Sequence, residues 1–489
     1  MKNSKVLTLL VLILAAASFL RLYALGSAPP GLYSDEAVNG NNAVQALSNN
    51  EFKSFYSENN GREGLFINIQ ALALKAFCSD NCRNNGPIFP LRLPSAIFGI
   101  LTVLGVYLLS KEFFEDERIA LLAAFLIAVS FWHVNFSRIA FRAIMAPAFL
   151  TWGLYLLLRS FRNSKLEIRN WPLPILAGLV YGLGMHSYIA YRATPLIIVF
   201  GLWLLSYKYG RGAVMKIGTV FVVSSIIVFL PLGLYFLQNP ADFLGRTSQI
   251  SVSQSSSPIK DLALNTLKTA GMFNFVGDWN PRHNIPGNPL LYWPVGILFL
   301  IGLIVAIRNL FKTSSFGFRI LLAWLFVAAL PVIISNEGLP HALRAILMAP
   351  PVFILAAIGG VRLYDFAVRK LRAPRTILRT TVFVLSALLF LRAGGVYFVE
   401  WTQNPATESA FNRDIVEIGR EINNLAPEIP KYVVIDTGGH DIRKIGTAAQ
   451  TLMYITDTYL PEKQKAKNLY YISTEELSEV SQDSYIIKL

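Results

Sequence analysis

The stretch MKIGTVFVVSSIIVFLPLGLYFL, residues 215–237, contains a single charged side chain, Lys216. A transmembrane helix needs about 20 consecutive, mostly apolar residues. Of the 489 residues in the whole chain, 54% are hydrophobic and 15% are charged, whereas soluble domains average about 25% charged residues. These values exclude a cytosolic multidomain enzyme, a disordered protein and a disulfide-rich scaffold. They predict an integral membrane protein with many spans.

Apolar windows of similar character recur along the chain. We therefore predict a polytopic α-helical membrane protein with about eleven transmembrane helices, near residues 6–25, 91–110, 118–134, 142–158, 171–187, 191–207, 215–237, 290–307, 319–334, 343–361 and 380–397. The apolar stretch 65–77 is too short to span a bilayer. It is expected to form a helix that lies on the membrane surface.

The distribution of basic residues predicts the orientation of the chain. With the N-terminus inside, the inner segments hold 20 of the 44 Lys and Arg residues, whereas the short outer turns hold few. Because short cytoplasmic loops are rich in Lys and Arg, the net charge of +14 reflects topology, and nucleic acid is not an expected partner. Residues 1–25 resemble a cleaved signal peptide only loosely, so a retained first helix is favoured.

The topology predicts two regions. Residues 1–397 form the transmembrane module, with large outer loops at 26–90 and 238–289. Residues 398–489 lie outside the membrane. This tail alternates helix-like pieces (411–425 and 446–456) with strand-like pieces (431–436, 468–472 and 484–488), which predicts a small α/β domain.

Polar side chains gather at the outer ends of the predicted helices. A transporter would instead place ionisable residues within the spans. Acidic groups come first and basic groups recur at the later outer turns, a pattern that suits an anionic lipid headgroup beside a proton-accepting carboxylate. The residues are Asp35, Glu36, Arg62, Glu63, His133, Arg138, Arg142, His186, Tyr188, Arg192, Arg282, His283, His341 and Arg344.

Several segments in this order resemble those of bacterial GT-C glycosyltransferases. The first is GLYSDEA (31–37), directly after the first predicted span. The others are NGREGLF (60–66), RLPSAIFGILTVLGVYLL (92–109), WHVNFSRIAFRA (132–143), GLGMHSYIAYRATPL (182–196), GDWNPRHNIPGNPLL (277–291) and LPHALRA (339–345). The set is most similar to the protein-mannosyltransferase-like branch, grouped with family 39 and the RgtA/B/C/D-like enzymes.

The resemblance implies an inverting transfer of one sugar, a mannose-like hexose or a pentose, from a polyprenyl-phosphate donor to an acceptor hydroxyl. By its match to the family's first-loop aspartate, Asp35 is the expected general base, with Glu36 beside it. The expected contacts to donor phosphate and substrate are Arg62, Arg138, Arg142, Tyr188, Arg192, His283 and Arg344. The chemistry agrees, because a carboxylate activates a hydroxyl and Arg side chains bind phosphate well.

Each candidate residue also has a simpler interpretation. Asp35 is also suited to cap the helix that follows it, and Glu36 to favour a helix N-terminus. In a direct role, Glu36 would instead orient the acceptor or hold a divalent ion with Asp35. The arginines are suited to contact lipid headgroups, and Tyr188 with Arg192 to anchor a span at the interface. A histidine in a loop, such as His283, is often structural.

No cofactor is assigned from the sequence, although a divalent cation is compatible with the family. The histidines show no metal-binding spacing such as HxxxH, so no metal ligands are predicted. Cys78 and Cys82 lie on the predicted outer side, where disulfides persist. They are candidates for a disulfide bond.

Two other functions remain open at this stage. One is a lipid or polysaccharide transporter, and the other is an O-antigen ligase-like enzyme. An oligosaccharyltransferase is disfavoured, since the tail lacks a WWDYG-like motif and its one tryptophan is Trp401. The expected location is the cytoplasmic (inner) membrane, and the expected partners are the lipid donor, a protein, lipid or glycan acceptor, and membrane lipids.

Overall fold

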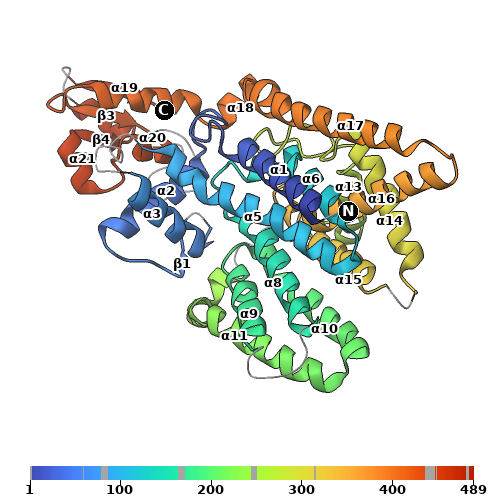
Figure 1. Cartoon of the computed structure of the whole chain (residues 1–489). Helices are drawn as coiled ribbons and strands as arrows, with labels where there is room; N and C mark the ends of the chain where they lie inside the picture. Colours follow the sequence, from blue (N-terminus) through green and yellow to red (C-terminus); the bar gives the residue numbers. More distant parts are fainter. Residues whose placement is uncertain are drawn as a thin grey trace. The chain divides into compact units, whose positions relative to one another are not determined.

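The structure, a computed structural model, consists mostly of helices in two compact units (Figure 1). It describes residues 3–58, 60–78, 86–162, 171–243, 251–312, 315–435, 447, 449–480 and 484–489. Unit 1 comprises Met1–Tyr23, Ser95–Ser137 and Arg142–Tyr397, and unit 2 comprises Ala24–Pro94, Arg138–Phe141 and Phe398–Leu489.

Unit 1 is built from long apolar helices joined by short loops. Its described helices are α1 (Asn3–Leu22), most of α5 (Ile88–Phe114), α6 (Glu117–Ala128), α7 (Phe131–Phe136), η1 (Arg142–Ile144), α8 (Met145–Arg162), α9 (Pro172–Gly184), η3 (Ile189–Ala193), α10 (Pro195–Tyr209), α11 (Arg211–Gln238), η4 (Val252–Gln254), α13 (Pro258–Gly271), α14 (Trp293–Asn309), α15 (Phe316–Ile333), η5 (Ile346–Met348), α16 (Ala349–Arg369) and α17 (Arg375–Gly395). A π-helical turn, η6 (Val396–Trp401), follows α17.

Within the described residues, eight helical segments are long and apolar enough to cross a membrane. The prediction of a polytopic helical membrane protein is therefore confirmed. Two further predicted spans contain helices of 13 residues (α9) and 17 residues (α14), each shorter than the hydrocarbon core requires for an untilted helix. The count of eleven spans stays a prediction.

The predicted span 118–134 is not one continuous helix. It consists of α6, which ends at Ala128, and the short α7, which begins at Phe131. The break follows from Ser130, whose hydroxyl accepts the backbone N–H of His133 and so caps a new helix. This break places α7 where it contacts the loops before α14 and η5.

Small residues allow α14 and α16 to pack closely along each other (Figure 1). A Cβ atom on Gly302 of α14 would lie 1.8 Å from the carbonyl oxygen of Leu355, and one on Gly359 of α16 would lie 1.9 Å from that of Leu298. Only glycine fits at such a backbone-to-backbone crossing. The loops that precede these two helices in the sequence hold the candidate site of unit 1.

Unit 2 contains a three-stranded parallel sheet with strand order β4-β3-β5. Its strands are β3 (Lys431–Val434), β4 (Leu469–Ile472) and β5 (Tyr485–Lys488), and its helices in this part are α18 (Pro405–Ala410), α19 (Arg413–Asn424), α20 (Ala449–Ile455), α21 (Pro461–Lys467) and the short η7 (Glu475–Glu479). Ile422, Val433 and Leu452 contribute to the core between sheet and helices. The predicted α/β character of the tail agrees with these elements, and its location outside the membrane stays a prediction.

The first predicted outer loop belongs to the same unit. It forms α2 (Ser34–Ser48), the two-residue strands β1 (Phe55–Tyr56) and β2 (Arg62–Glu63), and α3 (Leu65–Phe77), which is the helix expected over 65–77. Ala43 of α2 packs with Ile67, Ala71 and Leu74 of α3. Helix α2 also packs against α20. The first predicted outer loop and the C-terminal tail, which the sequence analysis placed in two separate regions, therefore belong to one unit.

Candidate functional site

Asp35 lies in the first turn of α2 and forms an ion pair with Arg62. The helix begins at Ser34 after Tyr33, so Asp35 stands inside the helix and not at the capping position. Its Oδ1 accepts a hydrogen bond from Nη2 of Arg62 at 2.8 Å. The Asp35 side chain is 34% exposed and that of Arg62 is 7% exposed. The structure therefore holds a partly accessible carboxylate in a fixed orientation beside a buried guanidinium.

Arg62 is itself held by the backbone and side chains of α2. Its Nη1 donates to Oδ1 of Asn39 at 2.6 Å and to the carbonyl oxygen of Asp35 at 3.4 Å. Asn39 in turn donates to the carbonyl oxygen of Ala140 at 3.0 Å. Together, these hydrogen bonds hold the Asp35–Arg62 pair in one orientation.

Glu36 occupies a different environment from its neighbour. Its carboxylate is fully buried and accepts hydrogen bonds from Nε of Arg92 at 2.9 Å, from Nη2 of Arg92 at 3.1 Å and from the backbone N–H of Ala140 at 3.0 Å. Arg92 also donates to the carbonyl oxygens of Pro29 and Gly31. Glu36 thus ties α2, the preceding loop and α5 together, which is a structural role.

Arg138, also in unit 2, is fully buried. Its Nη2 donates to the carbonyl oxygen of Ala28 at 2.9 Å, and its guanidinium lies 4.9 Å from the ring centre of Phe398. These contacts stabilise the fold of unit 2. The predicted role of Arg138 in phosphate binding stays a prediction.

In unit 1, three of the predicted residues lie near the helix ends around η1 and η3. The guanidinium of Arg142 lies 5.8 Å from the ring centre of Tyr188. The guanidinium of Arg192 lies 4.8 and 4.6 Å from the ring centres of Phe236 and Phe243, and it donates to the carbonyl oxygen of Phe243 at 2.8 Å. Arg142 and Tyr188 are thus brought together, and Arg192 connects the end of α11 to η3.

The short helix α7 anchors two loops of unit 1. The indole N–H of Trp132 donates to the carbonyl oxygen of Ala342 at 3.0 Å, and the side chain of Asn135 donates to the carbonyl oxygen of Arg282 at 2.8 Å. Trp132 is fully buried. One helix of six residues therefore positions both the loop before α14 and the loop before η5.

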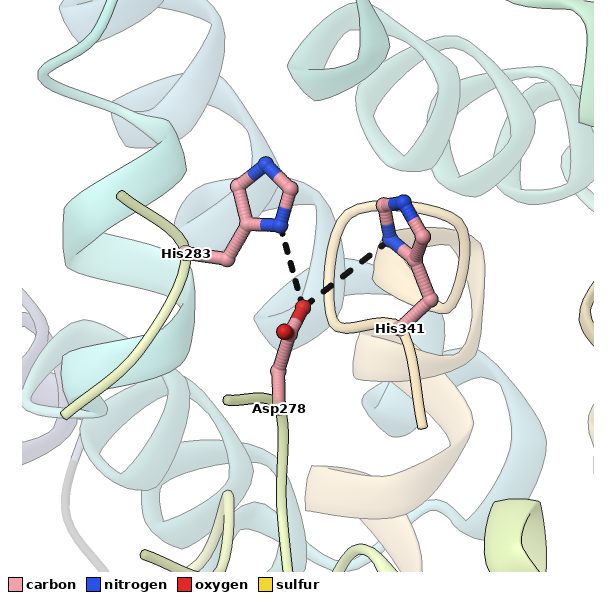
Figure 2. A group of neighbouring side chains, drawn as sticks. All are labelled: Asp278, His283 and His341. Carbon is pink, nitrogen blue, oxygen red and sulfur yellow. Dashed lines mark hydrogen bonds and ion pairs between the residues drawn. The ribbon is translucent and has the colours of Figure 1, made fainter. Parts of the chain in front are cut away.

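Asp278, His283 and His341 meet where these two loops lie against each other (Figure 2). Nδ1 of His283 lies 3.0 Å from Oδ2 of Asp278, and Nδ1 of His341 lies 3.9 Å from the same oxygen. The two imidazole rings are 5.0 Å apart at their centres. Burial lowers the pKa of His283, and the nearby positive charges of Arg282 and Arg344 act in the same direction, whereas Asp278 opposes them.

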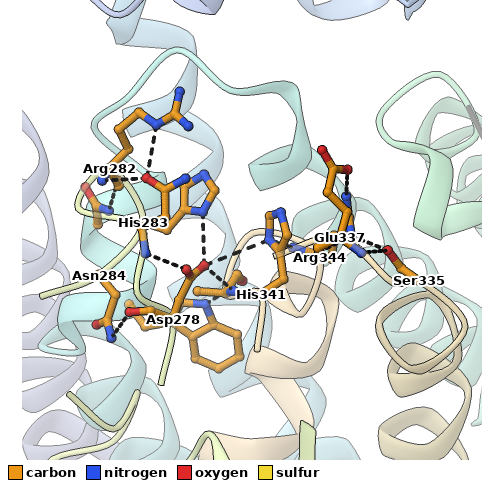
Figure 3. Close-up of polar contacts among 12 residues, drawn as sticks. Asp278, Arg282, His283, Asn284, Ser335, Glu337, His341 and Arg344 are labelled. Carbon is orange, nitrogen blue, oxygen red and sulfur yellow. Dashed lines mark hydrogen bonds and ion pairs between the residues drawn. The ribbon is translucent and has the colours of Figure 1, made fainter. Parts of the chain in front are cut away.

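The carboxylate of Asp278 is fixed by backbone N–H groups. Its Oδ1 accepts from Asn280 and its Oδ2 from Ala342, both at 2.8 Å. Figure 3 shows this network extending from Asp278 to both loops. Asp278 is thus the centre of the cluster, because it bonds to its own loop and to the loop of His341.

Arg344 lies beside this cluster and contacts the same loop. Its guanidinium donates to the hydroxyl of Ser335, to the carbonyl oxygen of Glu337 at 2.8 Å and to Oε2 of Glu337 at 2.5 Å (Figure 3). The Arg344 side chain is 8% exposed, whereas that of Glu337 is 57% exposed. The arginine is buried, and the carboxylate that neutralises it is open to solvent.

Sequence reasoning missed Asp278 and did not join His283 to His341. Asp278 and His283 occur in one motif, residues 277–291, and His341 occurs in another, residues 339–345. The histidines indeed lack a metal-binding spacing, but the fold brings them together from separate loops. The signal that was present is the combination of Asp, Asn and His in residues 277–291, within the second predicted outer loop.

The disulfide predicted between Cys78 and Cys82 stays a prediction. Cys78, at the end of α3, is buried. Cys82 lies outside the described residues.

The comparisons with known proteins agree with this architecture. A family model described as dolichyl-phosphate-mannose-protein mannosyltransferase matches residues 75–245. The crystal structure of ArnT from Cupriavidus metallidurans, bound to undecaprenyl phosphate, is similar with a TM-score of 0.58 and 12% identity, covering 96% of this chain and 90% of that chain. The chain has the GT-C fold and is similar, over residues 75–245, to the protein mannosyltransferases.

A second solved structure has the same architecture. The archaeal oligosaccharyltransferase AglB from Archaeoglobus fulgidus, in complex with an inhibitory peptide and a dolichol-phosphate, has a TM-score of 0.56 and 15% identity, covering 98% of this chain and 70% of that chain. The Archaeoglobus fulgidus oligosaccharyltransferase in complex with Zn and sulfate has a TM-score of 0.54 and 15% identity, covering 94% of this chain and 62% of that chain. The search of curated proteins gave no significant match. At these identities the structural similarities establish the fold of this chain.

Proposed function

We propose that this chain is a glycosyltransferase that moves one sugar from a polyprenyl-phosphate donor to an acceptor hydroxyl on the outer face of the cytoplasmic membrane. The donor class is supported by the matched family model and by ArnT, which is solved with undecaprenyl phosphate. The sugar is a mannose-like hexose or a pentose. The hydroxyl belongs to a protein, a lipid or an envelope glycan.

Asp35 is the proposed general base. Its carboxylate takes the proton of the acceptor hydroxyl while the acceptor oxygen bonds to the anomeric carbon. The bond between that carbon and the phosphate oxygen breaks, and the polyprenyl phosphate leaves with the electron pair. The observation that carries this assignment is the contrast within α2, because Asp35 is partly exposed and Glu36 is fully buried. A base has to reach its substrate proton within hydrogen-bond distance.

The basic side chains are the proposed partners of the donor phosphate. Arg344 is the strongest candidate in unit 1, since it is buried and its present partner Glu337 is largely exposed. The phosphodiester of the donor has one negative charge and gains a second as the sugar leaves, and a buried guanidinium stabilises this developing charge. Arg142, with Tyr188 beside it, is the second candidate, whereas Arg138 and Arg192 are engaged by backbone carbonyls.

Sugar transfer in proteoliposomes tests the proposal. Purified full-length protein is supplied with a panel of radiolabelled polyprenyl-phosphate sugars and a crude envelope acceptor. Asp35→Asn is expected to lower the transfer rate at least about a hundredfold, as loss of a general base typically does. The matched control is Asp414→Asn, which changes another carboxylate in the first turn of a helix of unit 2 and is expected to retain the wild-type rate.

Three results would contradict the proposal. Equal transfer by the wild type and Asp35→Asn would exclude Asp35 as the base. Equal loss in both variants would show a general effect of removing charge. Movement of labelled lipid across the bilayer without sugar transfer from any donor would favour the transporter.

A further inference from the structure

The cluster of Asp278, His283 and His341 has the composition and the dimensions of a metal site. One ligand atom from each residue can be chosen so that all three lie within 4.8 Å of one another. In a tetrahedral zinc site, ligand bonds of about 2.0–2.2 Å place neighbouring ligand atoms about 3.3–3.6 Å apart. The separations of 3.0 and 3.9 Å from Oδ2 of Asp278 lie on either side of this range, and the three ligand atoms, which lie within 4.8 Å of one another, have to move closer together to share one ion.

Nδ1 of His341 lies near the Asp278 carboxylate without forming a hydrogen bond to it, since the distance to Oδ2 is 3.9 Å. The backbone N–H of Arg344 lies 3.4 Å from the same nitrogen. Because an imidazole nitrogen has one lone pair, metal binding at Nδ1 would replace this long contact. A metal ion between Nδ1 of His341 and Oδ2 of Asp278 would bind both.

The supporting contacts are those that a metal site needs. Metal ligands are usually oriented by a second set of hydrogen bonds. Here the backbone N–H groups of Asn280 and Ala342 hold the Asp278 carboxylate, and the ring of Phe136 contacts that of His283. Asp278 and His283 are 3% and 5% exposed, which keeps competing water from most of the site.

A simple hydrogen-bonded Asp–His pair explains only part of this arrangement. It accounts for Asp278 and His283, but it gives His341 no function in the cluster. The positive charge of Arg344 nearby weakens cation binding. Glu337 offsets that charge through its ion pair.

We propose that Asp278, His283 and His341 bind one Zn²⁺ ion, with a water molecule or a substrate oxygen as the fourth ligand. Two imidazoles and one carboxylate are a ligand set that suits zinc and related first-row metals better than Mg²⁺ or Ca²⁺. The ion joins the loop before α14 to the loop before η5, and so fixes the segment that carries Arg344. This inference does not depend on the proposed sugar-transfer reaction.

The test measures metal binding directly. Full-length protein in detergent is stripped of metal with a chelator, titrated with Zn²⁺ or Mg²⁺ alone, and analysed for bound metal after gel filtration and by calorimetry. The wild type is expected to retain close to one Zn²⁺ per chain and no Mg²⁺. His341→Gln is expected to bind Zn²⁺ at least about tenfold more weakly.

His341→Gln is the decisive variant, because His341 has the longest contact to Asp278 and its replacement least disturbs the loops. Asp278→Asn is a second variant, interpreted only if it elutes as a folded species. The control is His186→Gln, another buried histidine of unit 1, whose Nε2 contacts the carbonyl oxygen of Val228; it should bind zinc as the wild type does.

Two outcomes overturn the proposal. One is the absence of stoichiometric zinc in the wild type. The other is wild-type zinc affinity in His341→Gln. An equal loss of zinc affinity in His186→Gln would also count against the proposal, since zinc binding would then be sensitive to the loss of any histidine.

Discussion

At the scale of single residues, the pair Asp35 and Glu36 shows how adjacent carboxylates acquire different functions. Both stand in the first turn of α2, where negative charge favours the helix. Successive helical positions point in different directions, so one side chain meets Arg62 near solvent and the other meets Arg92 in the interior. The sequence predicted both as site residues, and it could not separate them because burial depends on contacts with distant segments.

Glu36→Gln is expected to destabilise the protein by about 3–5 kcal/mol, because it leaves the buried charge of Arg92 without its partner. Asp35→Asn is expected to cost less, about 1–2 kcal/mol, since the Asp35 carboxylate is partly exposed and the buried Arg62 keeps its hydrogen bond to Asn39. Thermal unfolding of both variants in the same detergent checks this. A similar loss of stability in the two variants would contradict the difference in burial between the two ion pairs.

At the scale of secondary-structure elements, the close contact of α14 and α16 depends on two glycines. Gly302→Ala and Gly359→Ala are each expected to destabilise the protein by about 1–3 kcal/mol or more, because the new methyl group meets backbone and not a movable side chain. The measurement is the midpoint of thermal unfolding in detergent.

Gly212→Ala is the control for these two substitutions. Gly212 lies in α11, and a Cβ atom added there would meet no other atom within 4 Å. Alanine at this position is therefore expected to be neutral or to stabilise the helix by up to about 1 kcal/mol. Tolerance of alanine at Gly302 and Gly359 would show that the backbones of α14 and α16 are not in direct contact.

Most elements were predictable from local sequence, and most tertiary contacts were not. Each apolar window contains helix because long apolar runs satisfy their backbone internally. The strands of the tail fall within the predicted segments. Helix α13 was missed, since it lies in a loop assigned to the exterior on hydropathy alone. The Asp278 cluster was missed because its two loops are distant in sequence.

At the scale of the whole molecule, the distribution of Lys and Arg predicts an N-terminus inside and a C-terminus outside. Alkaline phosphatase fused after Leu489 is therefore expected to be active, and a fluorescent protein fused there is expected to stay dark. Fusions after Lys370, in the basic segment that follows α16, should give the opposite result. An active phosphatase at Lys370 would reverse the predicted orientation.

Unit 2 is assembled from segments at opposite ends of the chain. Asn41 of α2 donates to the backbone and side chain of Gln450, 409 residues away. At a synthesis rate of about 5–20 residues per second, about 20–80 s separate the appearance of these two residues. During that interval the segment bearing Asp35 has no α20 to pack against. Folding of the candidate base region therefore has to wait until the segment around Gln450 has been synthesised.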